Sequence, residues 1–320
     1  CQRPQGPKVD HRRKIIPRKT KRKRRQERQA SVESRKDLKI NERRASQEKK
    51  DFQFKIKNEV IMRLQNQIIL ITGSTTGIGA AMARLFVKEG AKVILHGRNI
   101  ERANALRDEF GPENSAFVQG DLQDPESPAQ IAREALNCFG EIDCLVNNAA
   151  FTTRGHLQNT DVAFFDRIIA VNLRAPLQLI RHLFPALKKS EGCVVNIGSV
   201  LAHCGQANML AYSVSKGGLM TMTRNLADSH GTDKVRFNQL NVGWTLTDNE
   251  YQVKLDDGLA EDWPETLPEY AAPSGRILAP EEIAEAAVYW ASKASRPITG
   301  SVLELEQYPL IGRYTNHENK

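Results

Sequence analysis

Two side chains that could act together in proton transfer lie four residues apart, Tyr212 and Lys216. If this segment is helical, both side chains project from the same face of the helix. A phenol ordinarily has a pKa of about 10, and a neighbouring ammonium group lowers that value by favouring the phenolate. Such a pair can exchange a proton with the oxygen of a bound carbonyl or alcohol.

A second candidate site is the glycine-rich segment TGSTTGIG (72–79), which follows the apolar run IILIT (68–72) and opens a helical stretch. Its glycines are Gly73, Gly77 and Gly79. Glycine permits a tight turn with positive φ, and its missing side chain lets a pyrophosphate approach the backbone. The free amide groups and the dipole of the following helix then stabilise the phosphate charge. This context favours dinucleotide binding over an ordinary glycine-rich turn.

The end of the second apolar run, KVILHG (92–97), indicates which dinucleotide binds. NAD enzymes usually place an Asp or Glu there for the ribose hydroxyl, whereas this chain has Arg98 and no carboxylate. A guanidinium can pair with the 2′-phosphate, so we expect NADP(H) rather than NAD(H). His96 could assist, although a lone histidine at a strand end is more often structural. Asp121 could bind the adenine amino group, or it could simply cap a turn.

Apolar runs alternate with helical segments along the chain and must position these residues. We expect strands over residues 68–72, 92–97, 115–121, 141–150, 192–198, 234–240 and 299–305. We expect helices over residues 77–90, 101–110, 124–140, 161–188, 211–229 and 280–291. This alternation predicts an α/β fold, a doubly wound parallel sheet of the Rossmann type with about seven strands in a single domain. Residues 244–279 are rich in Pro, Gly and acidic residues, and we expect a lid or binding loop without regular structure.

The charge of the 320-residue chain is unevenly distributed. Residues 1–60 hold 22 Lys and Arg against 8 Asp and Glu, whereas the remainder holds 24 against 30. A run of like charges stays solvated, so we predict a disordered basic N-terminal extension over 1–61 and one domain over 62–320. The acidic domain argues against nucleic-acid binding. Because Met62 opens a natural domain start, we favour an upstream extension of the reading frame, with a tether for nucleic acid or an anionic surface as the alternative.

Other classes of protein are disfavoured by composition. The chain has no run of about 18 apolar residues and no charged-then-apolar N-terminal stretch, so we expect neither a membrane span nor a secretory signal. Its five cysteines form no C-x-x-C pair. We therefore expect reduced thiols, no metal site and a cytoplasmic location.

Five segments occur in the order found in the short-chain dehydrogenase/reductase family. From about residue 64 to 305, the chain resembles that family's subgroup of oxidoreductases with about 250 residues. The matching segments are TGSTTGIG (72–79), NNAA (147–150), VNL with Asn172, NIGS with Ser199, and the Tyr212-x-x-x-Lys216 pair. The Y-x-x-x-K pair alone has low specificity, but the ordered set with Ser199 thirteen residues before Tyr212 is specific.

The resemblance implies a role for each catalytic candidate. Tyr212 is the general acid/base, Ser199 binds and orients the substrate oxygen, and Lys216 also holds the nicotinamide ribose. Asn172 anchors a water in a proton relay behind Lys216. The cofactor-binding set implied is Gly73, Thr75, Thr76, Gly77, Ile78, Gly79, Arg98, Asp121, Leu122, Asn148, Ala149, Tyr212, Lys216, Gly243 and Thr245. Relatives are often homo-oligomers, dimers or tetramers, built on the helices expected at 161–188 and 211–229.

The chain departs from the family pattern at three places. Ala150 replaces Gly, Val242 replaces the usual Pro in NVGWT (241–245), and LELEQYP (303–309) stands where Asp-Gly-Gly is usual. The missing Pro leaves the loop after the sixth strand less rigid, although Thr245 and Thr247 remain candidates for cofactor contact. The departures at NVGWT and LELEQYP suggest a distinct branch of the family and weaken any transfer of a specific substrate.

Polar and aromatic residues around the expected active site bear on the substrate. They are His203, Gln206, Asn208, Trp244, Glu250, Tyr251, Glu261, Asp262 and Trp263. This mixture favours a small polyhydroxylated substrate such as a sugar or polyol, with a 3-oxoacyl thioester of an acyl carrier protein as the alternative. A cofactor-sensing regulator without turnover is an alternative of another class, but such proteins typically lack the Tyr or the Lys. A sugar-nucleotide epimerase is disfavoured because its glycine spacing differs.

Overall fold

The computed structural model describes residues 23, 26 and 62–309. The predicted disordered extension over residues 1–61 therefore lies outside the described residues, apart from Lys23 and Gln26. Within the described part, no helix combines the length and the apolar character that a bilayer span would need.

Seven parallel strands form one sheet in the order β3-β2-β1-β4-β5-β6-β7. Their bounds are β1 Ile68–Ile71, β2 Lys92–Gly97, β3 Ser115–Gln119, β4 Cys144–Asn147, β5 Cys193–Ser199, β6 Arg236–Val242 and β7 Val302–Leu305. The chain builds outward from β1 to β3 and then returns to the centre with β4. This reversal opens a crevice at the carboxyl ends of β1 and β4, where doubly wound folds bind ligands. The predicted fold class is confirmed.

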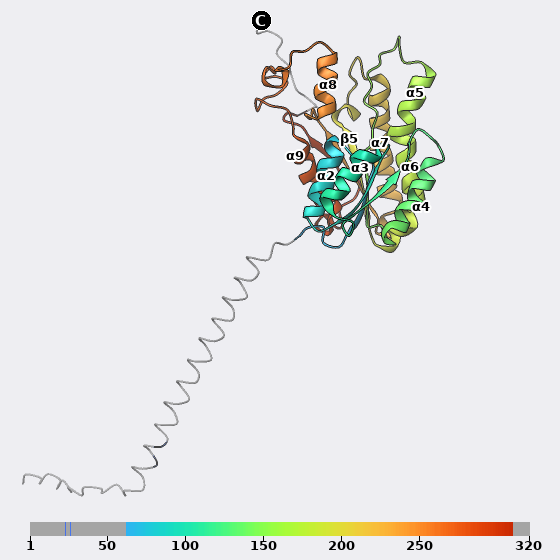
Figure 1. The fold of residues 1–320 in the computed structure, drawn as a ribbon, viewed down its shortest axis with the longest axis vertical. Coiled ribbons are helices and arrows are strands. Elements are labelled where there is room, and N and C mark those ends of the chain that lie inside the picture. The colour runs from blue at the N-terminus through green and yellow to red at the C-terminus, as the bar shows by residue number, and fades with distance from the viewer. Residues whose placement is uncertain (1–22, 24–25, 27–61, 310–320) are drawn as a thin grey trace, which may run out of the picture. The chain divides into compact units, whose positions relative to one another are not determined.

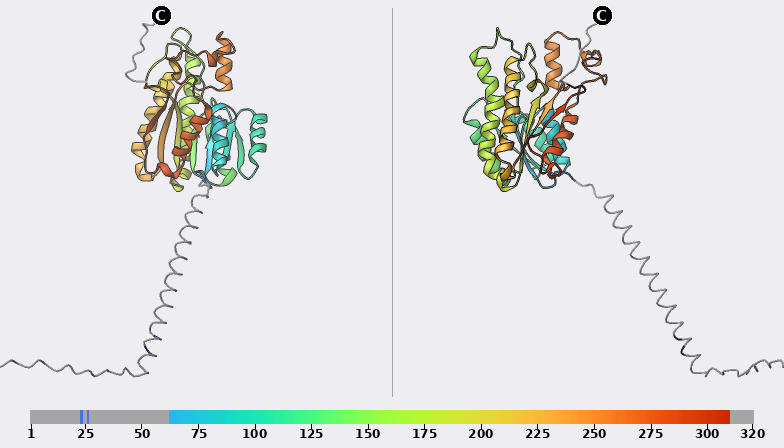
Figure 2. Two further views of the ribbon diagram at one scale, coloured as in Figure 1. Left: turned by 90° about the vertical axis from the view of Figure 1, so that its left-hand side faces the viewer. Right: turned by 180° about the vertical axis from the view of Figure 1, so that it is seen from behind.

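Helices cover both faces of the sheet, as Figures 1 and 2 show. One layer contains α2 (Gly77–Lys88), α3 (Ile100–Phe110) and α9 (Pro280–Ala291). The opposite layer contains α4 (Ser127–Phe139), α6 (Ala175–Lys189) and α7 (Leu210–Ser229). Alternate strand residues divide between the layers: Ile69 and Ile71 pack in the first core, and Leu70 in the second. The strands are therefore apolar throughout because both faces are buried.

The helix predicted over 161–188 is interrupted. Helix α5 (Val162–Ile169) and α6 are joined by a π-helical turn, Ala170–Arg174. Such turns widen the helix locally and occur often at functional sites. Here the turn carries Asn172, whose side-chain bonds are described below.

The expectation that residues 244–279 lack regular structure is wrong, because they contain helix α8 (Asp248–Asp256). The side chain of Thr247 caps this helix by accepting a hydrogen bond from the Glu250 amide. None of the residues of α8 is buried. The helix therefore has no apolar periodicity from which the sequence could have revealed it.

Candidate active site

A cleft at the carboxyl ends of the first strands brings most of the predicted cofactor residues together. Its lining includes Gly73, Thr75, Thr76, Gly77, Ile78, Gly79, Arg98, Asp121, Leu122, Asn148 and Ala149. Tyr212, Lys216, Gly243 and Thr245 belong to the same predicted set but do not line this cleft in the described structure.

The glycine-rich turn is packed so tightly that larger residues would not fit. Gly73 has a φ of 63°, and a Cβ added there would lie 2.9 Å from the Cα of Ala149. A Cβ on Gly79 would lie 2.2 Å from the Gly73 carbonyl oxygen. Asn148 closes the turn from the exit of β4, since its Nδ2 donates to the carbonyl oxygens of Thr72 at 2.9 Å and Gly73 at 3.0 Å.

The start of α2 suits an anionic group. Among the described residues, no side chain caps the helix at Thr76, and its first turn contains no acidic residue. The first amide groups and the positive end of the helix dipole are therefore available to a phosphate at the cleft. The turn and the helix start together fit the pyrophosphate of a dinucleotide.

His96 supports the glycine-rich turn through hydrogen bonds. Only 2% of the residue is exposed, and its Nδ1 lies 3.4 Å from the Gly73 amide that donates to it. Its backbone pairs with Ser74, whose amide donates to the His96 carbonyl at 3.0 Å. Burial lowers the pKa of His96 to about 4, so the imidazole is neutral at pH 7.

Arg98 is exposed at the edge of the cleft, with its guanidinium carbon 5.8 Å from the centre of the Phe151 ring. Its carbonyl oxygen accepts a hydrogen bond from Gln119 Nε2 at 3.0 Å, which fixes the chain after β2. Asp121 also lines the cleft, but its Oδ1 accepts from the Gln123 amide at 3.0 Å. Asp121 therefore caps a turn here, and its contact with adenine stays a prediction.

Three of the four predicted catalytic residues meet at the carboxyl end of β5. Ser199 is the last residue of β5 and pairs in register with Val242 of β6. Tyr212 and Lys216 lie one turn apart on α7, with Lys216 Nζ 5.6 Å from the centre of the Tyr212 ring. Lys216 Nζ donates to the Ile197 carbonyl oxygen at 2.8 Å.

Burial sets the pKa values of both residues on α7. It raises the pKa of Tyr212 to about 12; a hydrogen bond with Ser199 opposes this rise, and the Glu250 charge adds to it. Burial lowers the pKa of Lys216 to about 8. The expectation that Lys216 would lower the pKa of Tyr212 is not met in this geometry. The Lys216 ammonium is itself buried and bonded to the Ile197 carbonyl, so the cost of burying a phenolate prevails.

Asn172 connects the cleft to the helix that carries Tyr212. Its Oδ1 accepts from the Phe151 amide at 2.8 Å, and its Nδ2 donates to the Phe151 carbonyl and to Ser215 Oγ, each at 3.0 Å. Ser215 Oγ donates in turn to the Tyr212 carbonyl at 2.7 Å. The sequence identified Asn172 as a candidate but gave no sign of this bracing role.

Two threonines after β6 have different surroundings. Thr245 is buried, and its hydroxyl donates to the Gly243 carbonyl at 3.2 Å. Thr247 lines the cleft, and its methyl carbon would lie 3.3 Å from a Cβ added at Gly77. Thr247 is therefore better placed than Thr245 for cofactor contact.

The aromatic residues of the 244–279 segment pack with one another. The ring centres of Trp244 and Trp263 are 5.5 Å apart in a stacked arrangement, and the ring centre of Tyr251 lies 6.2 Å from that of Trp263. Trp263 is 2% exposed and forms a small core with Ala272 and Ile277. The aromatic side chains expected at the substrate thus stabilise the lid itself, because so long a segment needs apolar burial of its own.

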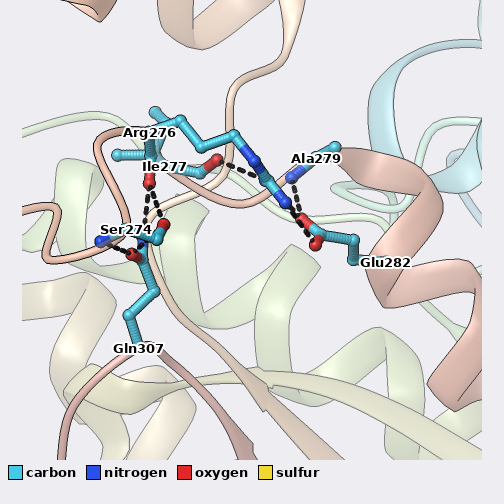
Figure 3. Close-up of polar contacts among 6 residues, drawn as sticks. All are labelled: Ser274, Arg276, Ile277, Ala279, Glu282 and Gln307. Atoms are coloured by element: carbon cyan, nitrogen blue, oxygen red, sulfur yellow. Dashed lines mark hydrogen bonds and ion pairs between the residues drawn. The ribbon is translucent and has the colours of Figure 1, made fainter.

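The segment that replaces Asp-Gly-Gly fastens this lid to the sheet edge. Gln307 Oε1 accepts from the amide of Ser274 at 3.0 Å and from its hydroxyl at 2.6 Å. Gln307 Nε2 donates to the Arg276 carbonyl at 2.7 Å. Arg276 pairs with Glu282 at the start of α9, and Figure 3 shows these contacts as one cluster. The Trp244 amide donates a further hydrogen bond to Glu306 Oε2 at 3.2 Å.

His203 and Glu250, two of the polar residues that the sequence analysis associated with the substrate, have contacts that the sequence does not reveal. His203 Nε2 lies 2.8 Å from Glu304 Oε1 and 3.2 Å from Asn241 Nδ2. Glu250 was noted only as one polar residue of the loop, but its charge acts on Tyr212.

The chain matches a protein-family model described as enoyl-(acyl carrier protein) reductase over residues 73–306. Among curated proteins, L-fucose dehydrogenase of Mus musculus is 34% identical over 238 residues, 73% of this chain and 85% of the relative. Cis-4-hydroxycyclohexanecarboxylate dehydrogenase of Sinomonas cyclohexanicum is 32% identical over 246 residues, 75% of this chain and 95% of the relative.

Solved structures of oxidoreductases are also similar to this chain. L-sorbose reductase from Gluconobacter frateurii, complexed with NADPH and L-sorbose, superposes with a TM-score of 0.73 at 27% identity, covering 79% of this chain and 99% of that one. The 3-ketoacyl-(acyl-carrier-protein) reductase from Brucella melitensis, complexed with NADH, gives 0.67 at 29% identity, with coverage of 76% and 97%.

Proposed function

The chain belongs to the short-chain dehydrogenase/reductase family, and we propose that it is an NADP(H)-dependent oxidoreductase that interconverts a carbonyl group and a secondary alcohol. The observation that carries the proposal is the meeting of Ser199, Tyr212 and Lys216 at the carboxyl end of the sheet, next to a cleft built for a dinucleotide. Bound NADP(H) supplies or accepts the hydride.

The chain's own residues handle the proton. Ser199 donates a hydrogen bond to the substrate oxygen and holds it near the Tyr212 hydroxyl. With a pKa of about 12, Tyr212 is protonated at pH 7 and ready to donate its proton during carbonyl reduction. Lys216 holds the nicotinamide ribose, and Asn172 anchors the water that returns a proton to the site.

The preference for NADP(H) rests on the end of β2. Arg98 borders the cleft there, and LHGRN (95–99) has no carboxylate for a ribose hydroxyl. The solved relatives were bound to NADPH in one case and NADH in the other, so the relatives themselves do not decide the preference. Pairing of Arg98 with the 2′-phosphate is the physical basis for our choice.

For the substrate we propose a small sugar or polyol. The L-fucose dehydrogenase and L-sorbose reductase relatives support this choice, as does the carboxylate of Glu250, whose charge acts on Tyr212. A 3-oxoacyl thioester is the second candidate, favoured by the acyl-carrier-protein reductase structure. A regulator without turnover is disfavoured because both Tyr212 and Lys216 are present.

The test is a nicotinamide-absorbance assay of the full chain. NADPH with L-sorbose, NADP⁺ with L-fucose and polyols, and NADPH with a 3-oxoacyl thioester are compared, with NAD(H) in parallel and a Tyr212→Phe variant. Turnover of sugars or polyols that the variant loses supports the proposal. Turnover confined to the thioester moves the chain to the second candidate, and NADPH binding without any turnover favours the regulator.

A further inference from the structure

Glu250 is held at the junction of the lid and the cofactor cleft. It lies in the first turn of α8, and its amide donates to Thr247 Oγ1 at 3.1 Å. Thr247 lines the cleft and lies against the turn at Gly77. The start of α8 is therefore fixed next to the site where the dinucleotide binds.

A hydrogen bond from Trp244 orients the carboxylate of Glu250. Trp244 Nε1 donates to Glu250 Oε1 at 2.8 Å. The Trp244 ring is itself fixed, because it stacks on Trp263 and its amide donates to Glu306. Trp244 follows β6, whose last residue Val242 pairs with Ser199. This contact therefore lies at the carboxyl end of the sheet, as the catalytic residues do.

One oxygen of this carboxylate is left for a ligand. Within residues 62–309, no hydrogen bond reaches Glu250 Oε2, and the side chain is 26% exposed. The nearest cation, Lys254 Nζ, is 3.9 Å from Oε1 and packs on the Trp244 ring. The charge of Glu250 also contributes to the raised pKa of Tyr212.

From this geometry we propose that Glu250 selects the substrate by accepting, through Oε2, a hydrogen bond from a hydroxyl group of a neutral polyhydroxylated ketone or alcohol whose reacting carbon lies at Tyr212. The inference rests on the proposed function, because it takes Tyr212 as the acid/base. An ionised acceptor binds a hydroxyl more strongly than a neutral one does. The same charge repels anionic substrates at this position.

The experiment compares L-sorbose with cyclohexanone, a ketone that has no hydroxyl group, as substrates for reduction by NADPH at pH 7. Glu250→Gln keeps the acceptor for Trp244 Nε1 but removes the charge and replaces Oε2 by an amide group. We expect kcat/KM for L-sorbose to fall by about tenfold or more, mostly through KM. The value for cyclohexanone is expected to change much less, because only the loss of the charge that acts on Tyr212 affects it.

Asp256→Asn is the matched control, since it makes the same charge change at the exposed end of α8, where Asp256 accepts from Gln252 at 3.0 Å. Equal thermal unfolding and equal NADPH binding establish that Glu250→Gln is folded. The proposed role of Glu250 is overturned if kcat/KM changes equally for both ketones, or if kcat/KM for L-sorbose does not change. Turnover confined to anionic or apolar substrates overturns it as well. Activity that survives in Tyr212→Phe contradicts the proposed function instead, so the two failures are distinguishable.

Discussion

Lys216 shows at the scale of one residue how catalysis and stability conflict. Burial lowers its pKa to about 8, so below that pH the folded protein carries a buried charge that the unfolded chain keeps in water. The unfolded state holds this proton up to its ordinary pKa, so the contribution of Lys216 to stability rises between about pH 8 and 10.5.

Replacing Lys216 by Met should therefore stabilise the protein and abolish turnover. We expect the free energy of unfolding at pH 7 to rise by about 2 kcal/mol. Urea titration measures this change, and the difference from the wild type should shrink as the pH approaches 10.5. A less stable variant at pH 7 would show that the bond to the Ile197 carbonyl outweighs the cost of burial.

Arg98 carries the choice of cofactor at the same scale. Arg98→Ala removes the guanidinium expected at the 2′-phosphate, and we expect the ratio of kcat/KM for NADPH to that for NADH to fall by about tenfold to a hundredfold. Arg133→Ala, which removes an exposed arginine from α4, serves as the control. An unchanged ratio in Arg98→Ala would refute our reading of this position.

At the scale of elements, the lid depends on its attachment to the sheet edge. Gln307→Ala removes the three hydrogen bonds to Ser274 and Arg276 and should loosen the segment before α9. We expect faster amide hydrogen exchange over residues 272–278 and a raised KM. Gln252→Ala, on the exposed face of α8, controls for loss of a glutamine. Exchange that stays as slow as in the wild type would mean that the Trp263 core alone fixes the lid.

The elements also show what could be predicted from the sequence and why. The apolar runs predicted the parallel sheet because buried strands are apolar on both faces, and the four-residue spacing placed Tyr212 and Lys216 together. Helix α8 was missed because it buries none of its residues. The π-turn was missed because it accompanies bonds from Asn172 to Phe151, 21 positions away. The rise in the pKa of Tyr212 follows from burial, which spacing does not reveal.

At the scale of the whole molecule, exposed apolar residues in the layer of α6 and α7, and on the adjoining α5, indicate a surface for a partner. Val162 on α5, Leu177 on α6 and Val214 on α7 are exposed by 76%, 44% and 48%. We propose that a second copy of the chain covers this layer in a dimer or tetramer. Val214→Glu should reduce the mass measured by light scattering after size exclusion. Lys88→Glu on α2, in the opposite layer, should leave it unchanged, and a wild-type monomer would contradict the proposal.

The central claim is hydride transfer to a carbonyl carbon with the proton supplied by Tyr212. The most direct measurement is reduction of L-sorbose with NADPH that carries deuterium at the transferred position of its nicotinamide ring, with the product analysed by mass spectrometry. The account predicts one deuterium at the new alcohol carbon with the wild type, and loss of product with Tyr212→Phe. Product without deuterium, or labelled product formed equally well by Tyr212→Phe, would contradict it.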